Sequence, residues 1–173
     1  MSDLLEQLFR DENADLQDIL KKRYEKTREI AAKEVRELVN DRLRTLPGES
    51  SGGGRETGSG ISQEKISFLA HYMGCSEKTV ERQLKCGTVQ TQQKPGRDFA
   101  IKLAFALNLS YRETQGLLAK TAHPLLKFSD TTPEALRDLI IFKWLEADES
   151  DIPEGTRLSR CLSELMKNDC AVL

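Results

Sequence analysis

The chain has little of what most enzymes and metalloproteins use. Its 173 residues include two histidines, one tryptophan and four cysteines, and no two cysteines have the CxxC spacing of zinc and redox sites. No GxSxG nucleophile elbow occurs. A phosphate-binding loop directly follows a strand, but the one glycine-rich stretch of this chain follows no strand pattern. We therefore predict that the protein is not an enzyme and that it binds no cofactor or metal.

Long apolar runs are also missing. None approaches the roughly 20 residues of a membrane span, and the acidic start, MSDLLEQLF, lacks the basic lead of a secretory signal. Unpaired, reduced thiols are then the expected state of Cys75, Cys86, Cys161 and Cys170. The sequence predicts a soluble, cytoplasmic protein with no membrane partner.

The net charge is only −2, but the charges are unevenly distributed. Residues 61–127 carry ten basic and five acidic side chains, whereas residues 128–173 carry five basic and ten acidic ones. Phosphate binding requires a local positive field, which favours residues 61–127 as a nucleic-acid-binding domain. The acidic extension has three interpretations: it binds a basic partner, it folds back over the basic face, or it is a solvated surface.

One long helical pattern, from residue 14 to residue 46, dominates the N-terminal segment 1–46. Apolar or small residues recur at steps of three and four, and no glycine or proline interrupts them. Such a face packs on the rest of the chain or on a second copy. We expect residues 14–46 to mediate homodimerisation or to bind a helical protein partner. Residues 47–60, with six glycines and three serines, predict a flexible linker.

The remaining sequence predicts an all-α protein. Ser110 with Glu113 three residues later is a capping box, and Thr132 followed by Pro133 favours a helix start. Two Arg-Asp pairs, Arg97-Asp98 and Arg137-Asp138, each precede an apolar helix, which fits either two related helix pairs or coincidence. The expected helices cover about residues 62–73, 76–86, 96–107 and 110–120 in the basic domain, and 133–145 and 156–167 in the acidic extension.

The segment from residue 62 to residue 86 has the pattern of a helix-turn-helix. Ala70 is small enough for a close helix crossing, and Gly74, four residues later, tolerates the positive φ that the turn requires. Val80 and Leu84 are spaced to close the core beneath the second helix. The opposite face of that helix is polar, and Lys, Arg, Gln, Ser and Thr side chains can read base edges or hold phosphates. Two carboxylates on it, Glu77 and Glu81, would repel phosphates.

These residues resemble the lambda-repressor-like, xenobiotic-response-element type of helix-turn-helix family, over roughly residues 65–118. The family's first pattern is matched by Leu69, Ala70, Gly74, Cys75 and Ser76, and its later pattern by Pro95, Leu103, Ala104, Leu107 and Ser110. The sequence departs from the family where Ile66 replaces a usual glutamine, with Gln63 one turn earlier, and where the loop after Gly87 is longer.

The resemblance implies a lambda-repressor-like bundle in which a recognition helix, about residues 76–86, binds double-stranded DNA. It implies base-facing roles for Ser76, Lys78, Thr79 and Arg82, with Gln83 beside them, and phosphate contacts from Lys85, Lys94 and Arg97. We predict a DNA-binding transcriptional regulator that acts as a dimer. The alternative is a non-enzymatic adaptor, for instance an antitoxin or defence-system subunit, that uses the helical bundle to bind a protein partner.

Overall fold

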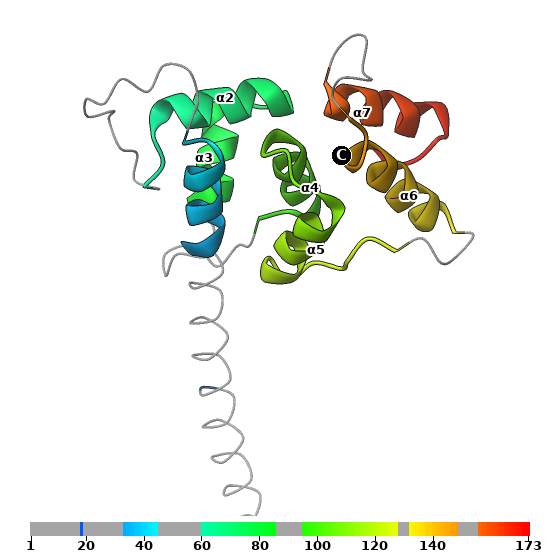
Figure 1. The fold of residues 1–173 in the computed structure, drawn as a ribbon, viewed down its shortest axis with the longest axis horizontal. Coiled ribbons are helices and arrows are strands. Elements are labelled where there is room, and N and C mark those ends of the chain that lie inside the picture. Colours follow the sequence, from blue (N-terminus) through cyan, green and yellow to red (C-terminus); the bar gives the residue numbers. More distant parts are fainter. Residues whose placement is uncertain (1–17, 19–32, 45–59, 86–94, 128–131, 149–155) are drawn as a thin grey trace, which may run out of the picture.

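The computed structural model describes residue 18 and residues 33–44, 60–85, 95–127, 132–148 and 156–173. These ranges contain helices, turns and loops but no β-strand, so the predicted all-α class is confirmed (Figure 1). Residues 33–42 are the described part of the first helix. The others are α2 (Gln63–Met73), α3 (Glu77–Lys85), α4 (Arg97–Ala106), α5 (Tyr111–Lys120), α6 (Pro133–Leu145) and α7 (Arg157–Lys167).

Helix starts follow the local signals of the sequence. Ser110 and Glu113 form a complete capping box at α5, in which each side chain accepts a hydrogen bond from the other residue's backbone N–H. Thr132 caps α6, and Pro133 occupies its first turn, where a missing N–H costs nothing. The predicted starts of these two helices are therefore confirmed.

Helix α4 is the centre of the bundle. Six of its ten residues are buried, and α2, α5 and α7 all pack against it. Phe105, only 1% exposed, is its largest buried side chain. This large share of buried residues is typical of a helix surrounded by others. Helix α4 thus joins the helix pair α2–α3 to the C-terminal pair α6–α7, with α5 beside it (Figure 1).

Residues 33–44 pack into this bundle. Val35, Val39 and Leu43 follow each other at steps of four and are buried in the same core as α2 to α5. Arg42 also pairs with Glu113 of α5. In this range the apolar face thus packs on the chain itself, one of the two possibilities that the pattern left open. Of the long helical pattern, residues 14–17, 19–32, 45 and 46 lie outside the described residues, as do residues 47–59 of the predicted linker, Cys86 and Lys94.

The C-terminal extension forms a helix pair, α6 and α7, that contacts α4 and the α4–α5 turn. Arg157, at the start of α7, is only 4% exposed. Its guanidinium donates to the backbone oxygen of Leu145, 2.9 Å away, and to the side-chain oxygen of Asn108 in the α4–α5 turn. A buried arginine needs such acceptors to offset the loss of hydration. Among the described helices, none is long and apolar enough to cross a membrane.

Candidate nucleic-acid interface

The turn between α2 and α3 has the predicted geometry. Gly74 adopts φ +63° and ψ 37°, the left-handed conformation that ends α2. The backbone N–H of Cys75 donates to the carbonyl of Ala70 over 3.0 Å, which closes the turn. A Cβ built at Gly74 would meet nothing within 4 Å. Glycine is therefore favoured here by backbone conformation and not by lack of space.

The first turn of α3 is capped and its apolar face is buried. The Ser76 hydroxyl oxygen accepts the backbone N–H of Thr79 over 3.2 Å, and the two hydroxyl oxygens lie 2.9 Å apart. Val80 and Leu84 are 0% and 2% exposed. Because these two side chains face the core, the residues on the other side of α3 face outward.

The sequence-predicted site residues divide into three groups. Ser76, Lys78 and Arg82 are exposed along α3, as a base-reading face requires. Thr79, Gln83, Lys85 and Arg97 are half-buried. Lys94 is not among the described residues. The structure thus brings Lys78 and Arg82, one helical turn apart, onto one exposed stretch of α3.

Both carboxylates of α3 are engaged within the protein. Glu77 accepts hydrogen bonds from the Gln63 side-chain amide, 2.8 Å away, and from the Ser67 hydroxyl, 2.7 Å away. Glu81 pairs with the Lys85 ammonium over 2.6 Å. Glu77 is therefore directed toward α2, and the charge of Glu81 is compensated, which reduces the repulsion of phosphates that the sequence predicts.

The C-terminal half of α3 is tied to two other elements. The side-chain oxygen of Gln83 accepts the backbone N–H of Gly96, 3.1 Å away, just before α4. From the first helix, Arg36 donates to the backbone carbonyl of Leu84 over 3.3 Å. A cation near the last carbonyls of a helix also interacts favourably with its dipole. The side chain of Gln83, expected beside the base-reading residues, thus connects α3 to the start of α4.

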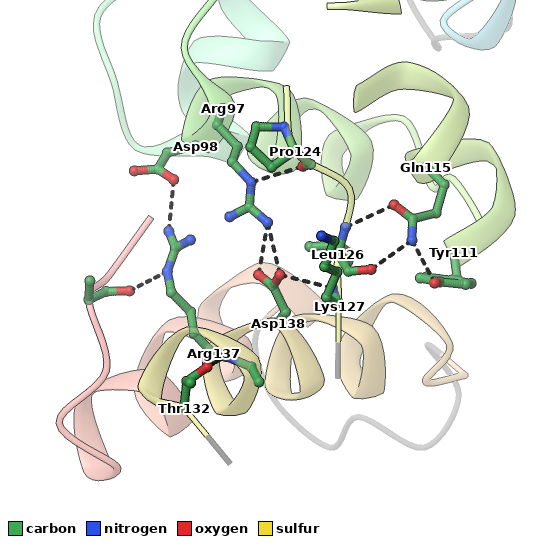
Figure 2. A network of polar contacts seen from close by, with 12 residues as sticks. Arg97, Asp98, Tyr111, Gln115, Pro124, Leu126, Lys127, Thr132, Arg137 and Asp138 are labelled. Atoms are coloured by element: carbon green, nitrogen blue, oxygen red, sulfur yellow. Dashed lines mark hydrogen bonds and ion pairs between the residues drawn. The ribbon is translucent and has the colours of Figure 1, made fainter. Parts of the chain in front are cut away.

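Arg97, expected to contact phosphate, binds inside the protein instead (Figure 2). Its Nη2 donates to both carboxylate oxygens of Asp138, 2.9 and 3.0 Å away, and its Nε donates to the carbonyl of Pro124 over 3.2 Å. Arg137 makes the reciprocal ion pair with Asp98 over 2.7 Å. The two Arg-Asp sequences are therefore cross-paired, each arginine with the other pair's aspartate. In the sequence, only the repetition of the Arg-Asp dipeptide indicated that α4 and α6 are related.

The helices of the acidic extension, α6 and α7, lie away from α3. Helices α6 and α7 pack beside α4, and α2 and α3 lie on the other side of it (Figure 1). In this arrangement, Lys78 and Arg82 are exposed, so the described part of the extension, residues 132–148 and 156–173, does not fold back over α3. Within the described residues, no three His, Cys, Asp or Glu side chains are grouped as a metal site would need.

Comparisons of the chain with protein-family models, with curated proteins and with solved structures found no match. The class of the protein is thus defined by its fold alone: a bundle of α-helices in which α2 and α3 are joined by a left-handed glycine turn.

Proposed function

We propose that this protein binds double-stranded DNA through α3 and acts as a transcriptional regulator. One observation carries the proposal: α3 buries Val80 and Leu84 and exposes Lys78 and Arg82. A helix held in this way behind a tight turn fits the major groove, where lysine and arginine bind guanine edges or phosphates. We also propose a dimer, because a single module reads few base pairs.

The charge distribution supports this function. The domain that contains α3 carries the basic excess, and the acidic extension is packed on the other side of α4. On α3, Glu77 is hydrogen-bonded toward α2, and Glu81 forms an ion pair with Lys85. Lys78 and Arg82 are the exposed cations that approaching phosphates would meet on α3.

The test is DNA binding by the full chain, measured as fluorescence anisotropy with labelled genomic fragments at several salt concentrations. We expect binding that weakens steeply with salt, because phosphate contacts release counterions. Lys78→Ala with Arg82→Ala should weaken binding at least tenfold, since each such contact contributes about 1–3 kcal/mol. Lys167→Ala, an exposed cation of α7, is the matched control. Unchanged binding by the double variant would disprove the proposal.

A second candidate function, a protein-interaction adaptor, is supported by the surface of α6 and α7. Leu136 and Leu139, 42% and 46% exposed, line an open hollow of about 530 Å³, and Met166 of α7 is 61% exposed. Exposed apolar patches often mark protein contacts. Leu139→Lys would abolish the capture of a protein partner from native-cell lysate and leave DNA retention unchanged. If DNA is retained and Leu139→Lys changes no protein capture, the adaptor function is excluded.

A further inference from the structure

The carboxylate of Asp138 organises the contact between α6 and the start of α4. It accepts two hydrogen bonds from Arg97 and a third from the backbone N–H of Lys127, 3.0 Å away. The Asp138 side chain is 10% exposed and that of Arg97 is 21% exposed. An ion pair this shielded from water, with additional donors, holds its two elements in one relative position.

The start of α4 also forms a hydrogen bond with α3. Arg97 is the first residue of α4, and Gly96 precedes it as a cap residue that has no side chain to make a capping hydrogen bond. The N–H of Gly96 donates instead to Gln83 of α3. Two consecutive residues thus bind α6 on one side and α3 on the other (Figure 2 shows the Arg97 side).

Helix α3 needs polar contacts to neighbouring elements to keep its orientation. It has nine residues, and only Val80 and Leu84 among them are buried. An isolated helix of this length is not stable in water, and packing normally supplies what is missing. With two buried anchors one turn apart, the orientation of α3 depends strongly on its polar contacts to neighbouring elements.

We propose that Asp138 and Gln83 are positioning residues for α3: α6 fixes the first turn of α4 through Asp138, and that turn fixes α3 through Gln83. The C-terminal extension would then set DNA affinity without touching DNA. This consequence rests on the proposed function, whereas the positioning of α3 can be measured without DNA.

The first test is amide hydrogen exchange of the full chain, followed by NMR or mass spectrometry. In Asp138→Asn we expect the amides of α3, Val80 to Leu84, to exchange roughly fivefold faster relative to the α5 amides of Leu117 and Leu118, the factor that corresponds to one hydrogen bond. Leu117 and Leu118 are the internal reference, because the global loss of stability in this variant accelerates both sets of amides and cancels in their ratio. Arg97→Lys, a milder change, serves if Asp138→Asn does not fold.

Two further variants test whether Asp138 acts on α3 through the start of α4 and Gln83. Gln83→Leu should produce the same acceleration in α3, and adding Asp138→Asn to it should change little, because both act through the same contact. Lys143→Gln removes the exposed ion pair with Glu164, which joins α6 to α7 and does not involve α4. This control should leave α3 exchange unchanged. Additive effects of Gln83→Leu and Asp138→Asn would overturn the proposed route.

The second test is DNA affinity, expected to fall roughly fivefold in Asp138→Asn with an unchanged salt dependence, because no phosphate contact is lost. If α3 exchange does not respond to Asp138→Asn or Arg97→Lys, the positioning role is wrong even if the wild-type protein binds DNA. If α3 exchange responds but the wild-type protein binds no DNA, the positioning role stands and the proposed function fails.

Discussion

Arg97 and Asp138 form an ion pair across 41 positions of sequence, and Asp98 and Arg137, their immediate neighbours, form its reciprocal. Arg97 and Asp98 begin α4, whereas Arg137 and Asp138 lie in α6. The two pairs therefore join the central helix to the C-terminal extension. The ion pair of Arg97 also engages, within the protein, a cation that the sequence suggested for phosphate binding.

The Arg97–Asp138 pair should contribute substantially to stability. Asp138→Asn should lower the free energy of unfolding by about 3 kcal/mol, because it leaves a partly buried guanidinium without its counter-charge. Urea denaturation followed by circular dichroism measures this loss. Lys33→Gln, which removes an ion pair with Glu37 in which the side chains are 73% and 60% exposed, should cost less than about 1 kcal/mol. Equal effects of the two substitutions would contradict this account.

The turn at Gly74 should be sensitive to substitution for a purely conformational reason. Gly74→Ala should destabilise the protein by about 1–2 kcal/mol, because alanine is strained at φ +63° although its Cβ has room. Gly116 of α5 is a matched control, since a Cβ there also meets nothing within 4 Å. Gly116→Ala, in a helix, should stabilise by about 0.5–1 kcal/mol. Thermal unfolding of the two variants should shift in opposite directions.

The described part of the first helix should belong to the folding unit. Val39 is 0% exposed, so Val39→Ala should lower the free energy of unfolding by about 1–3 kcal/mol. The loss should be independent of protein concentration, because Val39 packs within the same chain. Denaturation at two concentrations a hundredfold apart tests this. A loss that depends on concentration would instead indicate that this face packs on a second copy.

Acid sensitivity should depend in part on Glu113. The hydrogen bond from the Ser110 backbone N–H lowers the pKa of Glu113 below its ordinary value of 4.5, against the opposing effect of burial, with help from the Ser110 hydroxyl and Arg42. A lowered pKa in the folded state contributes stability above pH 4.5, and this is lost as the pH falls through the folded-state pKa. Glu113→Gln should therefore flatten the loss of stability below pH 4.5, measured by urea denaturation between pH 6 and 3. An identical pH profile would disprove this role.

Cys161 should be unreactive in the folded protein. Burial, with the nearby Glu164 charge, raises the pKa of its thiol to about 12, so almost no thiolate exists at pH 8. Iodoacetamide at pH 8 should leave the Cys161 peptide unmodified and label it once urea unfolds the chain. Half-buried Cys170 provides the comparison in the same digest. Labelling of Cys161 at the rate of Cys170 would contradict the burial.

Local signals in the sequence were sufficient for most helix boundaries. The turn at Gly74, the capping box at Ser110 and the start at Pro133 each depend on residues within four positions, so a pattern of a few letters specifies them. The buried face of α3 was equally predictable, since Val80 and Leu84 lie one helical turn apart.

The candidate site was only partly predictable. The exposure of Lys78 and Arg82 followed from helical periodicity. The partners of Glu77, Gln83 and Arg97 could not be predicted, because each partner lies on another helix or just before one. The residues next to a side chain in sequence do not determine whether it binds water, phosphate or a carboxylate from another helix.

The amino-acid sequence by itself determined that the chain is helical, where most of the described helices begin, and which side of α3 is apolar, since these properties arise from neighbouring residues. Only the tertiary structure decided that α6 and α7 pack beside α4 rather than over α3, and that Arg97 binds Asp138. Contacts across 41 positions form only when the apolar core has brought the helices together, and the shielding that this core provides makes the Asp138 carboxylate the acceptor for Arg97.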